Sequence, residues 1–286
     1  MIRWGIVGLG RAGLARRRAL SARDDSVILH ECSRRDGDAP SLRTLLDSNI
    51  EAVALCRESA LHYDDVRAAL RADKHVLVEY PLALTHGEAS ELAELAHAKE
   101  RVLHVGHFGL LNPFHKRVAA AIDEQDVRGF EYVFSAGFGR AIRPLCDASL
   151  WGQSANSRLQ ALWSWFGPLE LESSEVELKR DGYEIDVHLR DRRGRCVVLR
   201  ESRRAGQTRG RSVRGVDRSE NSIELPAWKK WPDGFVLDTE CFVQQVKQSG
   251  SQSYIPLADV VDVVALSESI SLRAEIRREV QKAKDE

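Results

Sequence analysis

The sequence predicts an α/β protein: an N-terminal doubly wound parallel sheet, then an α+β domain with an open, largely antiparallel sheet. Short apolar runs alternate with helical patterns through residues 1–112, and a glycine-rich segment joins the first run to the first helix. From residue 113 onward, alternating apolar and polar residues separated by turn residues indicate antiparallel strands. We therefore expect two domains, 1–112 and 113–286.

The first domain is predicted to alternate strands with helices. Strands are expected at Ile2–Val7, Val27–Glu31, Glu51–Leu55, His75–Val78 and Val102–Val105. Helices are expected at Ala12–Ser21, Ser41–Leu46, His62–Ala72 and Thr85–Lys99. Thr85 with Glu88 three residues later forms a capping box at the start of the last helix. Such alternation implies parallel strands with right-handed crossovers, so a ligand is expected at their carboxyl ends.

The second domain is predicted to mix helices with a meandering sheet. Strands are expected at Gly129–Phe138, Glu170–Leu178, Tyr183–Leu189 and Cys196–Glu201, with a loop or edge strand at Gly206–Val213. Helices are expected at Phe114–Ile122, Arg158–Phe166, Asp238–Gln248 and Ala258–Lys284. The three tryptophans 151, 163 and 165 offer either a flat wall for a ligand or, as aromatic residues at helical spacing more often do, core packing.

Composition excludes several classes of protein. Lys and Arg total 42 and Asp and Glu total 43, so the net charge of -1 predicts neither a nucleic-acid nor a membrane partner. No apolar run approaches the ~18–20 residues of a membrane-spanning helix. The apolar N-terminal run reaches glycine too soon for a signal peptide. The five cysteines are scattered without a CxxC pair, so we expect no disulfide framework, no metal site and a cytoplasmic location.

A phosphate-binding loop is predicted at the first strand–helix junction. The segment Gly8-Leu9-Gly10-Arg11-Ala12-Gly13 matches GxGxxG, follows a predicted strand and opens a predicted helix. Gly8 permits the tight turn, Gly10 allows a pyrophosphate to approach the backbone, and Gly13 permits close packing of the helix on the strand. The alternative is a glycine-rich turn that binds no ligand. The context favours a dinucleotide at the helix N-terminus.

The end of the second strand predicts which nicotinamide cofactor binds. Ser33 stands where an acid that binds the ribose hydroxyls is expected, and Arg34 and Arg35 follow it. A hydroxyl with two guanidinium groups suits a 2′-phosphate, which predicts NADP(H), with NAD(H) at lower affinity. Two alternatives remain open: Glu31 restores an acid if the register shifts, and the arginines are otherwise simply solvated.

Motifs after the later strands resemble the glucose–fructose oxidoreductase and inositol dehydrogenase family. They are Ser59-x-x-His62, the run from Lys74 to Pro81, and Asn112-Pro113. The resemblance implies a Rossmann domain joined to a domain whose open sheet faces the nicotinamide. Members typically carry Glu-Lys-Pro, where this chain has Glu79-Tyr80-Pro81. The Asp and His of sugar-oxidising members fall near Gln153 and Ser157, neither of which can take a hydroxyl proton, and this disfavours sugar dehydrogenation.

Within that family the chain more closely resembles the biliverdin reductases. The matching segments are the glycine loop, Ser33-Arg34-Arg35, Cys56-x-Glu58-Ser59-x-x-His62, His75 to Pro81, Val102 to Leu111, Phe134-Ser135-Ala136-Gly137, Ser157-Arg158-Leu159 and Phe242-Val243-Gln244. The resemblance implies hydride transfer from NADPH to the central methine of a linear tetrapyrrole, with a proton to a pyrrole nitrogen. Gly106, Gly109 and the segment Arg140–Gly152 depart from the pattern.

The resemblance also assigns roles to site residues. Arg158 is expected to polarise the tetrapyrrole or position a proton carrier, and Tyr80 to shape the site and orient the substrate with a phenol able to donate a hydrogen bond. The alternatives are a surface salt bridge for Arg158 and simple packing before Pro81 for Tyr80. Cofactor contacts are expected from the glycine loop and Ser33 to Arg35, and further from Cys56, Ser59, His62, Glu79, Tyr80 and His107.

Three further expectations concern titratable residues of the first domain. Glu79 is expected to orient the nicotinamide ribose or carboxamide, or to pair with a nearby cation. His104 is expected to be buried or on the far face of the sheet. The cluster Arg16-Arg17-Arg18 is interpreted as a solvated helix face.

The expected ligand is a small molecule, a linear tetrapyrrole, bound by a monomer or homodimer. Two alternatives to biliverdin reduction stay open. One is reduction of another conjugated imine, enone or linear pyrrole with NADPH. The other is a non-catalytic protein that senses NADP(H), because the lost acid–base residues fit that role equally well.

Overall fold

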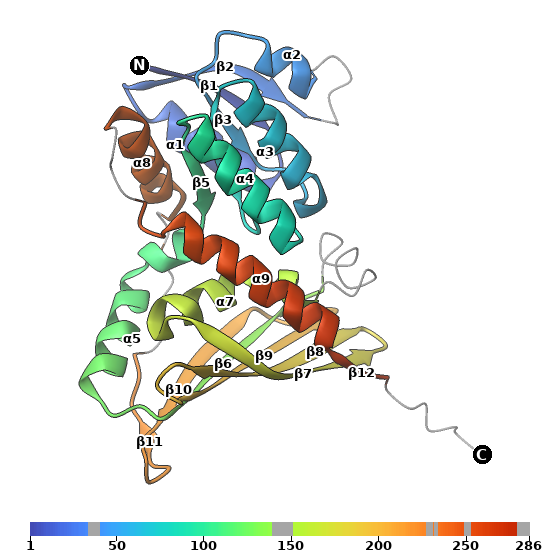
Figure 1. Cartoon of the computed structure of the whole chain (residues 1–286), viewed down its shortest axis with the longest axis vertical. Coiled ribbons are helices and arrows are strands. Elements are labelled where there is room, and N and C mark those ends of the chain that lie inside the picture. Colours follow the sequence, from blue (N-terminus) through green and yellow to red (C-terminus); the bar gives the residue numbers. More distant parts are fainter. Residues whose placement is uncertain (34–40, 139–150, 227–230, 232–233, 249–252, 279–286) are drawn as a thin grey trace, which may run out of the picture. The chain divides into compact units, whose positions relative to one another are not determined.

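The computed structural model describes residues 1–33, 41–138, 151–226, 231, 234–248 and 253–278 (Figure 1). The chain forms two compact units, one of Met1–Asn112 with Trp231–Ala265 and the other of Pro113–Lys230 with Leu266–Glu286. No helix among the described residues is long and apolar enough to cross a membrane.

The first unit is built on five parallel strands in the order β2-β1-β3-β4-β5 (Figure 1). They are β1 (Ile2–Val7), β2 (Ser26–Cys32), β3 (Ala52–Leu55), β4 (His75–Glu79) and β5 (Leu103–Gly106). Their side chains are largely buried on both faces, as near-continuous apolar strands of a parallel sheet require. The predicted doubly wound parallel sheet is confirmed.

Helices cover both faces of this sheet. On one face lie α1 (Arg11–Ser21) and α8 (Gly234–Lys247), and on the other α2 (Leu42–Leu46), α3 (His62–Arg71) and α4 (His86–Ala98) (Figure 1). Two short 3-10 helices, η1 (Ser59–Leu61) and η2 (Phe108–Leu111), follow β3 and β5. The predicted capping box at α4 is confirmed, because the Thr85 hydroxyl accepts from the Glu88 amide and the Glu88 carboxylate accepts from the Thr85 amide.

The predicted domain limits differ from these units in one segment. The sequence predicts that every residue after 112 lies in the second domain, whereas Trp231–Ala265 belongs to the first unit. The reason is that α8 buries its apolar face there: the Phe242 ring lies 5.1 Å from that of Trp4 on β1. The segment therefore completes the core of the N-terminal sheet.

The second unit is a seven-stranded sheet in the order β11-β10-β6-β9-β8-β7-β12, antiparallel except for the pairs β6–β9 and β7–β12. Its strands are β6 (Gly129–Gly137), β7 (Leu169–Lys179), β8 (Gly182–Asp191), β9 (Cys196–Arg204), β10 (Gly210–Val216), β11 (Ser222–Ile223) and β12 (Glu275–Arg278). Its helices are α5 (Pro113–Glu124), α7 (Trp151–Phe166) and the C-terminal part of α9 (Leu257–Arg273). The predicted open, largely antiparallel sheet is confirmed.

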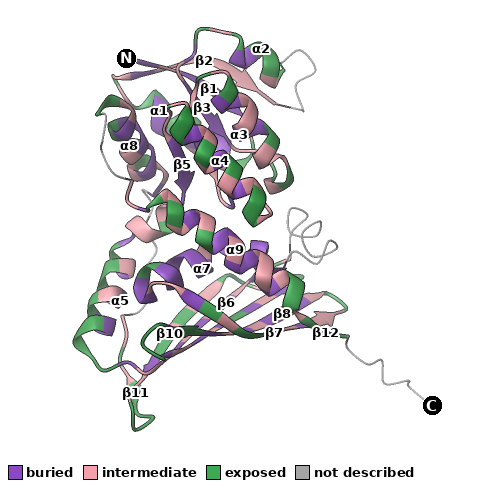
Figure 2. Ribbon diagram, viewed as in Figure 1, coloured by how far each residue is buried: buried purple, intermediate pink, exposed green. Residues whose placement is uncertain are grey.

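The core of the second unit lies between its sheet and α7. Buried and partly exposed residues alternate along β6, and 14 residues of the α7 helix are buried (Figure 2). Trp151, Trp163 and Trp165 are therefore core residues. On the other face of the sheet charged side chains pair across strands, as Arg200 does with Glu131 and Asp186.

Two elements of the second unit correct the sequence analysis. The single final helix expected at Ala258–Lys284 is wrong, because α9 ends at Arg273 and residues Glu275–Arg278 form β12. The free edge of β7 offers unpaired backbone groups, and pairing with them outweighs the helix propensity of this segment. The segment expected as a loop or edge strand is β10, which pairs with β6 and β11.

Close backbone contact shapes the junction between β1 and α1. Gly8 has a φ of +91°, in the left-handed region. A Cβ atom on Gly13 would lie 1.8 Å from the Gly8 carbonyl oxygen, so only glycine fits there. A Cβ atom on Gly10 would meet nothing within 4 Å.

We expect Gly13→Ala to lower the free energy of unfolding by about 1–3 kcal/mol, because the added methyl group must displace backbone. Gly10→Ala is the matched control and is expected to change it by less than about 0.5 kcal/mol. Urea unfolding followed by circular dichroism measures both. Equal stability of the two variants would contradict the tight contact between Gly8 and Gly13.

Candidate dinucleotide site at the strand ends

The segments that follow β1, β3, β4 and β5 meet at the carboxyl edge of the five-stranded sheet, since parallel strands end on the same side. A Cβ atom on Gly8 would lie 2.8 Å from the carbonyl oxygen of Cys56. The Tyr80 ring after β4 stacks on the His107 ring after β5, with centroids 5.1 Å apart and planes at 14°. Sequence-predicted residues from four separate segments are thus brought together.

The glycine loop has the geometry of a phosphate cradle. The Gly8 amide donates to the Cys32 carbonyl at 2.8 Å, which fixes the turn after β1. Gly10 caps α1 in an extended conformation and faces open space, and the first turn of the helix carries no acidic residue. Arg11 is exposed, Ala12 is half-buried, and Leu9 packs on the core beneath the loop. Open space beside free helix amides fits the pyrophosphate of a dinucleotide.

The end of β2 is described only in part. Ser33 directly follows the strand, whereas Arg34 and Arg35 lie outside the described residues. Glu31 lies on β2 and forms an ion pair with Arg17 at 3.5 Å.

Cys56, Ser59 and His62 lie along the connection from β3 to α3. Burial raises the pKa of the Cys56 thiol, so it is a neutral group beside the glycine loop. Ser59 begins η1. His62 is buried, with Nδ1 2.6 Å from the Pro81 carbonyl and Nε2 3.1 Å from the Arg57 carbonyl. Both nitrogens of His62 are engaged by backbone, so its side chain joins two loops.

Glu79, the last residue of β4, pairs with a cation, one of the two roles the sequence analysis expected. The Nε of Arg16 donates to Glu79 Oε1 at 2.9 Å. The interpretation of Arg16 as part of a solvated face is wrong, because its side chain is fully buried while Arg17 and Arg18 are exposed. Arg16 is three residues after the buried Gly13 and four before the buried Leu20, so helical spacing alone places it on the inner face.

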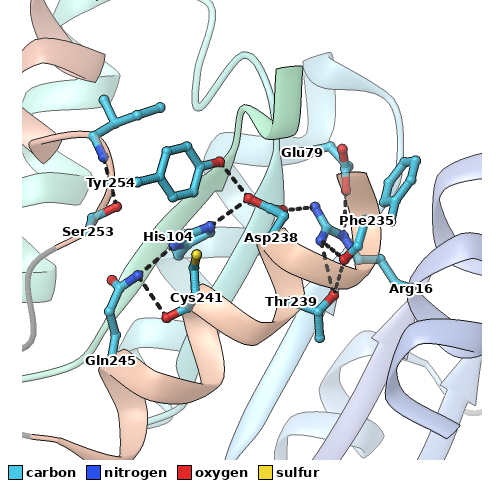
Figure 3. A network of polar contacts seen from close by, with 11 residues as sticks. Arg16, Glu79, His104, Phe235, Asp238, Thr239, Cys241, Gln245, Ser253 and Tyr254 are labelled. Atoms are coloured by element: carbon cyan, nitrogen blue, oxygen red, sulfur yellow. Dashed lines mark hydrogen bonds and ion pairs between the residues drawn. The ribbon is translucent and has the colours of Figure 1, made fainter. Parts of the chain in front are cut away.

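Arg16 belongs to a buried polar network that joins α1, β4, β5 and α8 (Figure 3). Its Nη2 forms an ion pair with Asp238 Oδ2 on α8. The other oxygen of Asp238 accepts from the Tyr254 hydroxyl at 2.5 Å and lies 2.9 Å from His104 Nε2. His104 is buried, as expected.

The contacts of Gln245 indicate which ring nitrogen of His104 is the hydrogen-bond donor. The Gln245 side-chain amide nitrogen lies 3.2 Å from the Cys241 carbonyl and 2.9 Å from His104 Nδ1 (Figure 3). An amide that donates to the carbonyl also donates to Nδ1, so the ring carries its proton on Nε2 and donates it to Asp238. His104 thus donates a hydrogen bond that helps to hold the Asp238 carboxylate.

His107 is a buried ring at the end of β5. Burial lowers the pKa of His107 to about 3, so the ring is neutral near pH 7. Neither ring nitrogen has a hydrogen-bond partner among the described residues. A neutral imidazole offers one donor and one acceptor, and neither is used within the described part of the chain.

Arg158 lies in the second unit and is buried on α7, which excludes the alternative of a surface salt bridge. It pairs with the buried Glu201, which also binds Arg203. Four guanidinium groups surround the Phe134 ring, with distances to its centroid of 4.6 Å (Arg158), 4.7 Å (Arg203), 5.7 Å (Arg209) and 5.9 Å (Arg211). We call these five residues the arginine–Phe134 cluster. Phe134, Arg158 and Arg203 are buried in this cluster.

The positions aligned with the sugar-oxidising acid and base lie on the same helix. Gln153 is buried and Ser157 is half-buried. Neither side chain removes a proton from a hydroxyl group at neutral pH. Among the described residues no group of three His, Cys, Asp or Glu side chains is arranged to hold a metal ion.

Comparisons with known proteins agree with this geometry. Residues 2–107 match the GFO/IDH/MocA model, described as an oxidoreductase family with an NAD-binding Rossmann fold. Biliverdin reductase A of Mus musculus is 32% identical over 255 residues, 84% of each chain. The Homo sapiens protein is 32% identical over 256 residues, again 84% of each chain.

Solved structures share the fold. Biliverdin reductase from Synechocystis sp. PCC 6803, in complex with biliverdin and NADP+, has a TM-score of 0.78 at 20% identity and covers 96% of this chain and 99% of that one. A 3-ketoreductase from Actinomadura kijaniata in complex with NADP and TDP-benzene has a TM-score of 0.75 at 22% identity, covering 98% and 99%. Together with the glycine loop and the identity to biliverdin reductase A, these findings show that the chain belongs to the GFO/IDH/MocA oxidoreductase family and is an NAD(P)-dependent oxidoreductase related to biliverdin reductase.

Proposed function

We propose that the chain is a cytoplasmic NADPH-dependent reductase that converts biliverdin to bilirubin. The observation that carries this proposal is the 32% identity to biliverdin reductase A over 84% of both chains. The Glu79-Tyr80-Pro81 segment and Arg158 add support from the site itself, as does the absence of an acid–base pair at Gln153 and Ser157.

The cofactor is proposed to lie along the strand ends of the first unit. The amides of residues 8–13 would hold the pyrophosphate, and Ser33, Arg34 and Arg35 the 2′-phosphate, which favours NADPH over NADH. The carboxylate of Glu79 and the free nitrogens of His107 are suited to hydrogen bonds with the nicotinamide ribose or carboxamide. When bound, the reduced nicotinamide supplies a hydride.

The substrate is proposed to contact the arginine–Phe134 cluster. Biliverdin is a flat conjugated chain with two propionates, so it offers both a π-face and anionic groups. Guanidinium groups bind carboxylates bidentately and stack on conjugated surfaces. The cluster supplies both kinds of contact around one aromatic ring.

Two side chains are proposed to favour protonation of the pyrrole nitrogen without giving up a proton of their own. Arg158 keeps its proton in proteins, so its proposed role is to polarise the tetrapyrrole and favour its protonated form. Tyr80 stacks on the neutral His107, which holds the phenol ring in one orientation after β4. Its hydroxyl is proposed to donate a hydrogen bond to the substrate.

The direct test mixes the protein, NADPH and biliverdin under anaerobic conditions. We expect the green absorbance of biliverdin to fall as that of bilirubin rises, with one NADPH consumed for each bilirubin formed. NADPH binding without bilirubin would contradict the substrate assignment. A panel of conjugated imines and enones would then distinguish another reductase from a non-catalytic NADP(H) sensor.

Arg158→Ala is expected to lower kcat for biliverdin at least about tenfold while the Kd for NADPH changes less than about twofold, because its proposed contacts are with the substrate. Arg190→Ala is the matched control, since Arg190 is 47% exposed in the same unit. Steady-state kinetics, NADPH titration and a thermal melt of each variant are the measurements. An unchanged kcat in a folded Arg158→Ala protein would refute the assigned role.

Arg34→Ala is expected to weaken NADPH binding about tenfold or more and to leave NADH binding unchanged, because only NADPH carries the 2′-phosphate. Arg18→Ala, an exposed arginine of α1, serves as the control. Isothermal titration calorimetry with both nucleotides measures the effect. Equal loss of both nucleotides would count against 2′-phosphate recognition.

A further inference from the structure

The guanidinium of Arg16 is divided between two carboxylates that come from different elements (Figure 3). We propose that Asp238 is a positioning residue that holds Arg16 so that only one of its nitrogens reaches Glu79, leaving Glu79 Oε2 for a ligand at the end of β4. The inference rests on the proposed function in one respect, that this ligand is the nicotinamide half of NADPH.

The contacts of Arg16 show how the guanidinium is divided. Its Nε donates to Glu79 Oε1 at 2.9 Å, and its Nη1 donates to Thr239 Oγ1 at 3.2 Å. Its Nη2 pairs with Asp238. Glu79 Oε2 has no hydrogen-bond partner within the described part of the chain, and the Glu79 side chain is 13% exposed. One carboxylate oxygen of Glu79 therefore remains open to a donor.

The pairing of Nη2 with Asp238 keeps Arg16 from turning both nitrogens toward Glu79. Its side chain is fully buried, and the Phe235 ring covers the guanidinium at 4.9 Å. On the strand side, a Cβ atom on Gly106 would lie 2.4 Å from Nη2 and 3.1 Å from Asp238 Oδ2, so Gly106 leaves room for this ion pair. Asp238 is itself held by His104 and Tyr254. Removing the charge of Asp238 frees Nη2 for Glu79.

The charges of Arg16 and Asp238 act in opposite directions on the pKa of Glu79, so a change in this division is measurable as a change in that pKa. Burial raises the pKa of Glu79, Arg16 lowers it, and Asp238 raises it further. Burial also opposes ionisation of Asp238, yet Arg16 and His104 hold its pKa below the usual value. Asp238 thus stays ionised where Glu79 titrates. The charged and titratable groups around Glu79 are Arg16 from α1, Asp238 from α8, His104 from β5 and Cys56 after β3.

The test follows the Glu79 carboxyl directly by NMR in protein labelled with 13C-glutamate, assigned by comparison with Glu79→Gln. In Asp238→Asn the titration midpoint of Glu79 is expected to fall by about one pH unit, because a like charge is removed and Arg16 turns toward Glu79. Glu240→Gln, an exposed carboxylate on the same helix, is the control and is expected to leave the midpoint unchanged.

Arg16→Lys is expected to shift the titration midpoint of Glu79 in the opposite direction. It also tests the proposal if Asp238→Asn folds poorly. A single ammonium cannot span both carboxylates and is expected to pair with the more acidic Asp238, so the Glu79 midpoint rises. Arg18→Lys is its matched control, because Arg18 is exposed on the same helix. Opposite shifts in the two variants support the proposal. Midpoints that stay unchanged in both, or move in the same direction, would overturn it.

Kinetics extend the test to the reaction. In Asp238→Asn kcat is expected to fall about tenfold with the Kd for NADPH changed less than about threefold, because the phosphates dominate binding and the nicotinamide end loses a contact. If wild-type protein shows the NMR pattern but does not reduce biliverdin, the proposed function fails and the positioning role stands. If biliverdin is reduced normally by both forms, the positioning role fails alone.

Discussion

Burial of the Arg16 guanidinium is the constraint on which the first unit depends. A fully buried cation requires paired partners, and Arg16 finds them in Glu79 on β4 and in Asp238 and Thr239 on α8. These ion-pair partners on α8 add to the contact of Phe242 with Trp4, which places α8 in the N-terminal unit. The ion pair of Arg16 with Asp238 also accounts for glycine at position 106, where a side chain would displace it.

The two candidate binding regions have complementary chemistry. The strand ends of the first unit combine a glycine loop suited to phosphates with a carboxylate and a neutral imidazole suited to a ribose or carboxamide. The arginine–Phe134 cluster of the second unit offers guanidinium groups around an aromatic ring. The phosphate-binding chemistry lies in the first unit, as the match to an oxidoreductase family with an NAD-binding Rossmann fold implies.

Sequence patterns predicted the features that depend on interactions between residues close together in the chain. The glycine loop, the strand–helix alternation and the capping box at Thr85 depend on neighbours within a few residues. The role of Arg16 does not: its partner Thr239 is 223 positions away, so the arginine triplet gave no sign of an ion pair. Helical spacing from Gly13 would have indicated its burial. The strand β12 was missed because its partner β7 lies far earlier in the chain.

The central claim is that a dinucleotide lies across the strand ends of the first unit, beginning at the loop of residues 8–13. Hydrogen–deuterium exchange with and without NADPH tests it most directly. The account predicts that NADPH slows exchange most in peptides covering Gly8 to Gly13 and the start of α1, because those amides would bind the pyrophosphate. Unchanged exchange in that loop at saturating NADPH would contradict it.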